Sequence, residues 1–205
     1  SSAASDVYKR QVMLCQENEA YLKVQVIKQG MFKVLCLAVK LHGQAFHVQT
    51  SILQALQYYE HLAEPMAELL GVMRTDFDIE RLGEDVLRDL AAKSFTSLDT
   101  KSPRSFGRFL VRMTELNPRT VLKQMSLLER QQESESYPIR NAMIEVHGLL
   151  IKYLSMSEDD VDIAPNEDDE DDDRSAPQKQ MDMLFERLFE RFLDLTTVSY
   201  THLTL

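Results

Sequence analysis

The chain has 205 residues, 44% of them hydrophobic, which is enough for one or two domains with a buried core. Six glycines and six prolines are few for a turn-rich β protein, and the longest wholly apolar run, residues 34–39, is far shorter than the roughly 20 residues that cross a bilayer. The formal net charge is −10, but residues 157–174 hold eleven acids and one base, so the rest of the chain is neutral.

The two ends of the chain differ from the sequence between them. Residues 1–11 (SSAASDVYKRQ) show no helical stripe and resemble a translated cloning or sequencing adapter, and residues 198–205 (VSYTHLTL) resemble another. We therefore expect non-native tails at 1–11 and 198–205, around a segment of a longer protein, and exclude both from the fold.

Apolar residues recur at helical spacing through the first half of the chain. Residues 17–43 predict a helical region that breaks at Gly30, and residues 46–62 predict a second helix. A new helical segment is predicted to begin at Glu64 and Pro65. Asp78 is placed to cap a helix over 79–93, and residues 94–103 are predicted to be a loop.

Residues 104–154 predict three successive amphipathic helices joined by very short turns. The first covers 105–116. Asn117 and Pro118 open the second, over 119–132, because Asn can cap free backbone N–H groups and Pro fits the first helical position. The third follows Pro138. Turns this short force neighbouring helices to pack antiparallel, as in stacked helical hairpins.

The acidic segment separates this region from one more helix. Residues 157–179 form an acidic linker with few large apolar side chains, and we expect it to be disordered. A further solenoid helix is predicted over 180–197. Because no strand alternation occurs, we predict an all-α fold: a HEAT-like α-solenoid of antiparallel hairpins over 12–156, with a disordered acidic insert.

Three stretches resemble one family, the condensin complex subunit 1 family of HEAT-repeat regulatory subunits, in a fungal-like form. They are residues 49–70 (QTSILQALQYYEHLAEPMAELL), 116–150 (LNPRTVLKQMSLLERQQESESYPIRNAMIEVHGLL) and 184–198 (LFERLFERFLDLTTV). HEAT repeats usually carry an Asp six residues before the Arg that corresponds to Arg140, forming a ladder between repeats. In this chain that position holds Ser134.

The resemblance implies a non-catalytic scaffold, because in that family ATP hydrolysis belongs to the SMC heads. It implies binding to the kleisin subunit and through it to the SMC pair, contact with DNA, and a part in compacting mitotic chromosomes. It places the protein in the nucleus and on chromosomes, and in the cytoplasm for part of the cell cycle. No cofactor, membrane or small-molecule substrate is expected. The alternative is another HEAT adaptor, of the nuclear transport receptor or phosphatase scaffold type.

A basic stretch is the candidate nucleic-acid surface. Residues 101–132 carry seven bases and two acids, a net charge of +5, and Arg104, Arg108 and Arg112 are spaced four apart on one helix. Such a row suits duplex phosphates, which need charge and hydrogen bonds but no sequence reading. An ordinary solvated helix face is the other interpretation. The candidate residues are Lys101, Arg104, Arg108, Arg112, Arg119 and Lys123.

The acidic segment has three interpretations: a solubilising insert, a strap that docks on the arginine row and competes with DNA, or a kinase substrate. Ser157, followed by three acids, resembles an acidophilic-kinase site. Ser102, followed by Pro103, is a minimal proline-directed site. A phosphate on Ser102 would add negative charge beside Arg104 and lower DNA affinity or order the loop.

No catalytic or metal-binding pattern accompanies these features. His42 and His47 lie five residues apart across a predicted turn, and no second pair has ligand spacing. Cys15 and Cys36 share no metal or redox spacing, so we expect reduced thiols. Neither a phosphate-binding glycine loop nor a nucleophile elbow occurs, and we therefore predict that the chain is not an enzyme.

Overall fold

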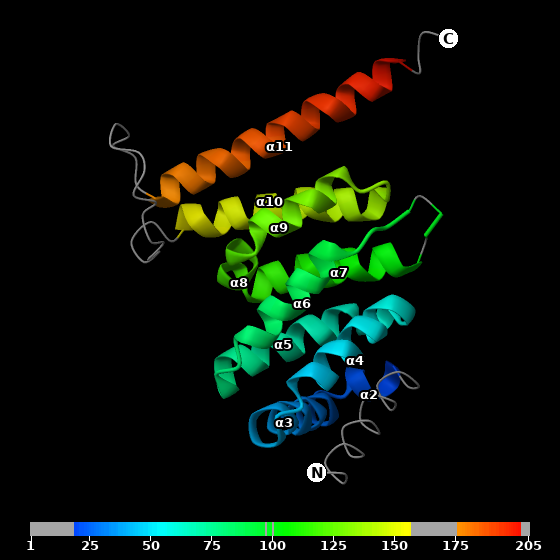
Figure 1. Cartoon of the computed structure of the whole chain (residues 1–205), viewed down its shortest axis with the longest axis vertical. Helices are drawn as coiled ribbons and strands as arrows, with labels where there is room; N and C mark the ends of the chain where they lie inside the picture. Colours follow the sequence, from blue (N-terminus) through cyan, green and yellow to red (C-terminus); the bar gives the residue numbers. More distant parts are fainter. Residues whose placement is uncertain (1–18, 97, 100, 157–175, 202–205) are drawn as a thin grey trace. The chain divides into compact units, whose positions relative to one another are not determined.

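The computed structural model describes residues 19–96, 98–99, 101–156 and 176–201. Within these residues every regular element is a helix and no strand occurs (Figure 1). The all-α fold class predicted from the sequence is therefore confirmed. Two compact units divide the chain, residues 1–143 and 144–205, and their boundary falls inside a helix.

The helices follow one another with short connections. They are α2 (Glu19–Lys23), α3 (Gln25–His42), α4 (Ala45–Tyr58), the 3-10 helix η1 (Glu60–Leu62), α5 (Ala63–Phe77), α6 (Arg81–Ala92), α7 (Lys101–Leu116), α8 (Pro118–Lys123), α9 (Met125–Leu128), the 3-10 helix η2 (Glu129–Glu133), α10 (Tyr137–Met156) and α11 (Ala176–Thr201). None of the described helices is long and apolar enough to pass through a bilayer.

Two helix boundaries in the first half differ from the prediction. The break in the first region lies at Val24, whose backbone is extended, while Gly30 continues α3. Asp78 does not begin α6; it ends α5 in the left-handed conformation, with φ of 57°. The amide of Ile79 then donates to the carbonyl of Met73 at 2.8 Å, which is a common way to close the last turn of a helix.

The remaining boundaries shift by smaller amounts. α7 begins at Lys101, two residues before the predicted end of the loop. The helix expected over 119–132 is divided into α8, α9 and η2. α11 begins at Ala176, so only residues 157–175 of the predicted acidic linker lie outside the described residues.

Side-chain contacts within residues 1–143 repeat at one sequence interval. Lys28 bonds to Glu68 and Gln49 to Asp89, each 40 residues apart. Arg112 bonds to Glu68 and Lys123 to Glu80, 44 and 43 residues apart. Each helical hairpin therefore contacts the hairpin about one repeat away, as expected of stacked repeats of some 40 residues. The HEAT-like solenoid architecture predicted for this part of the chain is confirmed.

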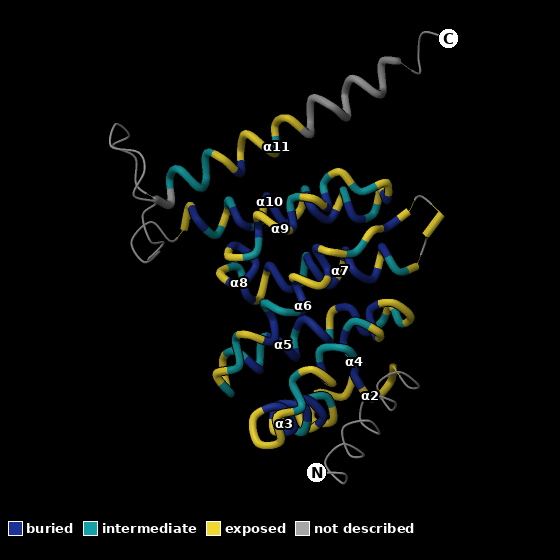
Figure 2. The backbone as a smooth tube through the Cα atoms, viewed as in Figure 1, coloured by how far each residue is buried: buried dark blue, intermediate teal, exposed yellow. Residues whose placement is uncertain are grey.

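The core of this unit consists of the apolar stripes that the sequence predicted. On α7, Phe106, Phe109, Leu110 and Met113 are all at most 1% exposed. Gly107 lies between them at a close helix crossing, where an added Cβ would be 3.1 Å from Cβ of Ala142 and 3.3 Å from the carbonyl oxygen of Pro138. Figure 2 shows these buried faces along successive helices, with exposed residues alternating between them.

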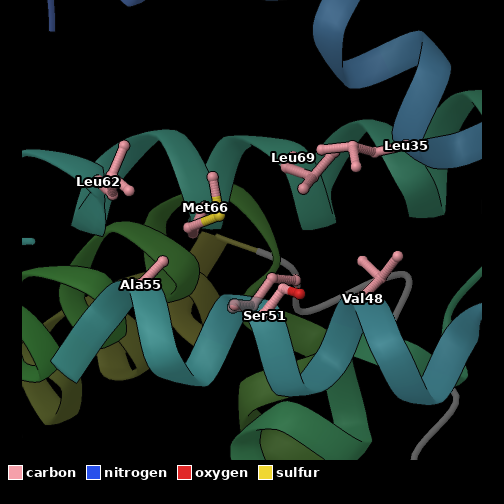
Figure 3. A pocket seen from close by; sticks show the side chains of 8 residues that line it. Leu35, Val48, Ser51, Ala55, Leu62, Met66 and Leu69 are labelled. Atoms are coloured by element: carbon pink, nitrogen blue, oxygen red, sulfur yellow. The ribbon is translucent and has the colours of Figure 1, made fainter. Parts of the chain in front are cut away.

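A small cavity remains between α3, α4 and α5 (Figure 3). Its lining is apolar except for Ser51, with Leu35 from α3, Val48 from α4, and Met66 and Leu69 from α5 among the facing side chains. Its volume is about 10 Å³, room for about one water molecule. We therefore regard it as a packing gap and not as a ligand site.

The second unit contains the later turns of α10, and α11. Val146, His147, Leu150 and Leu154 are buried on α10, and Leu184 is buried on α11. Phe185 and Phe189 of α11 are 39% and 63% exposed.

Candidate nucleic-acid interface

Helix α7 presents the predicted arginine row on its solvent side. Lys101, Arg104 and Arg108 are exposed, while Phe106 and Phe109 on the opposite face are fully buried. Residues four apart lie one above the other on a helix, so the basic groups form a line along α7. The helical placement predicted for Arg104, Arg108 and Arg112 therefore agrees with the structure.

Carboxylates from the preceding repeat lie next to this row. Arg108 Nη1 is 3.3 Å from Oε1 of Glu60 in η1, and both side chains are largely exposed. Lys123 Nζ on α8 is 2.8 Å from Oε1 of Glu80 and 3.6 Å from Oε1 of Glu84. The net charge of +5 counted over 101–132 therefore overstates the positive charge of the surface.

Arg112 takes part in a larger ion-pair network. Its guanidinium donates to Glu115 at 2.8 Å and to Glu68 at 3.5 Å, and Glu68 also accepts from Lys28 at 2.7 Å. The Lys28 and Glu68 side chains are only 17% and 24% exposed. The network joins α3, α5 and α7, and Nε of Arg112 is buried with no partner among the described residues. Arg112 is thus less available to a ligand than its neighbours.

Three of the candidate cations make no direct ion pair. In the described part of the chain, no hydrogen bond or ion pair holds Lys101, Arg104 or Arg119, and all three side chains are exposed. Lys101 and Arg104 lie together in the first turn of α7, whereas Arg119 lies on α8 beyond the other end of that helix. The structure therefore separates the six candidates into an α7 row and an α8 pair, Arg119 and Lys123.

The ion pairs also change proton affinities. The hydrogen bond from Lys123 is the main reason that the pKa of Glu80 is lowered, and the charges of Arg74 and Arg119 lower it further. The hydrogen bond to Glu80 raises the pKa of Lys123, and the one to Glu115 raises the pKa of Arg112. All these groups therefore stay charged near neutral pH.

Arg74 is a basic residue that the sequence interpretation did not include. It lies in the last turn of α5, and its Nη1 donates to Oδ1 of Asn117 at 3.4 Å. Asn117 occupies the N-cap position of α8, with Pro118 after it as predicted, but its side chain makes no capping bond. The amide instead links Arg74 of α5 to the start of α8, two residues before Arg119.

The predicted ladder arginine has a backbone partner. Arg140 Nη1 donates to the carbonyl oxygen of Ser134 at 2.6 Å, six residues earlier. The contact is made at the position where a HEAT repeat usually has an Asp, with the main chain as acceptor in place of a carboxylate.

The two predicted phosphorylation sites differ in what the structure describes. Ser102 is half-buried at the second position of α7, and Pro103 after it is buried. Ser157 lies outside the described residues.

The described residues contain no cluster of three or more His, Cys, Asp or Glu side chains that could hold a metal ion. Burial raises the pKa of Cys36 to about 12, so we expect little thiolate at this residue near neutral pH. Cys15 is outside the described residues.

An open groove of about 550 Å³ near α2 and α5 is lined mainly by charged side chains, including Glu64 and Arg108.

Comparison with known proteins gives one consistent result. Residues 6–48 match the family described as non-SMC mitotic condensation complex subunit 1, N-term, and this match includes residues 6–11 of the predicted tail. Condensin complex subunit 1 of Schizosaccharomyces pombe is 32% identical over 187 residues, which is 90% of this chain and 15% of that protein. The protein of the same name from Saccharomyces cerevisiae is 28% identical over 188 residues, 92% of this chain and 15% of its own length. The Xenopus laevis relative of that name is 23% identical over 146 residues, 70% of this chain and 11% of its own length.

Proposed function

The chain belongs to the condensin complex subunit 1 family, and on that premise we propose that it is a non-catalytic helical scaffold in a condensin complex. It spans about 15% of the length of the two yeast relatives, so it supplies only part of such a scaffold. Its role is to hold the kleisin subunit, and through it the SMC pair, close to chromosomal DNA during mitotic condensation. This function places it in the nucleus and on chromosomes, and in the cytoplasm for part of the cell cycle.

Repeated hairpins support the scaffold role. The described helices of residues 1–143 bury one face against their neighbours and leave the other face exposed. Stacked repeats of this kind present extended surfaces to other proteins. The partner test is copurification of this chain with kleisin and SMC subunits from the same cells. Recovery of the chain without either subunit would refute the scaffold assignment.

The observation that carries the DNA contact is the pair of unneutralised cations in the first turn of α7. Lys101 and Arg104 are exposed and hold no ion pair among the described residues. Arg108 is the next basic residue along this face of α7, and it forms an exposed ion pair with Glu60. Exposed ion pairs stabilise a protein by only about 0–1 kcal/mol, so a phosphate can replace the carboxylate. Arg112, Arg119 and Lys123 complete the proposed surface.

A charge-neutralising variant tests this contact. We expect Lys101→Gln with Arg104→Gln to weaken binding of this chain to a labelled DNA duplex of mixed sequence. Losing two phosphate contacts should reduce the slope of log affinity against log salt by about 1.8. The matched control is Arg81→Gln with Arg88→Gln on α6, which removes the same charge from two exposed residues paired with Asp85. Equal slopes for the two double variants would refute the α7 contact.

Phosphorylation of Ser102 would act on the same residues. A phosphate there adds about −1.5 to −2 charge beside Lys101 and Arg104, which would reduce DNA affinity. Ser157 remains a second proposed kinase site, with acids at the three following positions.

A further inference from the structure

Three cations from two helices gather around one carboxylate, away from the first turn of α7. Lys123 Nζ lies 2.8 Å from Oε1 of Glu80 and 3.6 Å from Oε1 of Glu84. Arg119 lies four residues before Lys123 on α8, so the two share a face of that helix. Arg74 reaches the same place through its hydrogen bond to Asn117, two residues before Arg119.

The electrostatics agree with this arrangement. The positive charges of Lys123, Arg74 and Arg119 all lower the pKa of Glu80, although burial acts in the opposite direction. Three bases and two acids give the cluster a net charge of +1. Arg74 is 45 residues before Arg119 in the sequence, about one repeat, yet in the fold the charges of both act on Glu80.

The carboxylate of Glu80 can be displaced from this cluster. The side chains of Lys123 and Glu80 are 56% and 41% exposed, and exposed ion pairs contribute about 0–1 kcal/mol. Glu80 can therefore turn toward solvent at small cost. An arriving phosphate would then meet one ammonium and two guanidinium groups, which bond to phosphate oxygens more strongly than neutral donors do.

We propose that Arg74, Arg119 and Lys123 form a second phosphate-contact site for duplex DNA, and that Glu80 competes with the phosphate for these cations. The proposal rests on the DNA contact proposed above and adds Arg74 to it. In free protein Glu80 neutralises the site in part, and DNA binding exchanges the carboxylate for a backbone phosphate. Glu80 thereby sets how strongly Arg74 and the two bases of the next repeat hold DNA.

Two single substitutions with opposite expected effects test the site. Glu80→Gln should tighten binding of this chain to the labelled duplex by up to about fivefold, because breaking an exposed ion pair costs about 0–1 kcal/mol and the variant has none to break. Its salt slope should stay near that of the wild type, because the same three cations then meet phosphate. Arg119→Gln should weaken binding and reduce the slope by about 0.9.

Each substitution has a control of equal charge on α6. Asp89→Asn matches Glu80→Gln, and its amide oxygen can still accept the hydrogen bond from Gln49. Arg88→Gln matches Arg119→Gln. Arg74→Gln should behave like Arg119→Gln, and Arg119 is the main test because no hydrogen bond of its side chain holds the described fold together.

The outcomes separate this proposal from the α7 contact. The second site is overturned if Glu80→Gln has the same DNA affinity as its control Asp89→Asn. It is also overturned if Arg119→Gln has the same DNA affinity as its control Arg88→Gln. If these pairs differ as expected while Lys101→Gln with Arg104→Gln binds like its control, the α7 contact fails and the second site stands. If wild-type chain does not bind the duplex at all, both proposals are overturned.

Discussion

Gln131 offers a test of how one repeat stabilises the previous one. Its side chain is 4% exposed, and Nε2 lies 2.8 Å from the carbonyl oxygen of Lys93, 3.0 Å from that of Ala91 and 3.3 Å from that of Leu90. These carbonyls end α6, where helices leave acceptors without partners. Replacing Gln131 with Met keeps the length of the side chain and removes the donor.

The expected cost follows from the number of acceptors left without a donor. An amide nitrogen has two hydrogens, so at most two of the three contacts are full hydrogen bonds. The Leu90 carbonyl also accepts from the amide of Lys93 at 3.1 Å, so it keeps a partner in the variant. Two acceptors therefore lose their donor, at about 1 kcal/mol each, and we expect Gln131→Met to lower the free energy of unfolding by about 2 kcal/mol.

Urea denaturation followed by circular dichroism measures this difference. The midpoint should fall while the dependence on urea stays unchanged, because the same surface is exposed on unfolding. Gln57→Met, at an exposed position of α4, is the control and should change stability by less than about 0.5 kcal/mol. A Gln131→Met variant as stable as this control would refute the inference that the amide serves the end of α6.

Three further predictions concern packing, pH and thiol reactivity. Gly107→Ala should lower the melting temperature, because its Cβ would meet the Pro138 carbonyl at 3.3 Å, whereas Gly148→Ala, with nothing within 4 Å, should raise stability by about 0.5–1 kcal/mol. Lys123 holds the pKa of Glu80 below its ordinary value of 4.5. The ion pair therefore stabilises the fold above pH 4.5, and this stabilisation is lost as the pH falls through the lower pKa of the folded state. In acid denaturation series, the advantage of wild type over Glu80→Gln should disappear from a value under about 1 kcal/mol at neutral pH. In a Cys15→Ser background, Cys36 should react with iodoacetamide at pH 8 only after unfolding, and rapid labelling of the native chain would contradict its burial.

Local periodicity was sufficient to predict the helices and their inner faces. Leu82, Val86, Leu87 and Leu90 of α6 follow one stripe in the sequence and are all at most 2% exposed in the structure. A stripe of this kind depends only on residues within a few helical turns. It becomes buried whichever element packs against it, so the sequence can predict it without knowing that element.

Helix ends were harder to predict because one residue type serves two purposes. Asp is common both where a helix starts and in the left-handed conformation that ends one, and Asp78 takes the second role. A glycine inside a helix costs only about 1 kcal/mol relative to Ala, so Gly30 did not have to break α3.

The electrostatic surface could not be predicted from a stretch of sequence. The carboxylates that pair with Arg108, Arg112 and Lys123 precede them by 39–48 residues, except for Glu115. Counting charges over 101–132 therefore leaves out the groups that decide which cations are free. Arg74 was missed for the same reason, since only the fold brings it to the start of α8.

The constant interval between contacting residues has a consequence for synthesis. Within the described residues 19–143, the hydrogen bonds and ion pairs named above between helices join positions at most 48 residues apart. When a hairpin leaves the ribosome, the preceding hairpin that it contacts has therefore already been synthesised. Translation at about 5–20 residues per second allows seconds for each docking step. The nascent chain can accordingly fold one hairpin at a time, from the N-terminal side onward. Little apolar surface then stays exposed until distant segments have been synthesised.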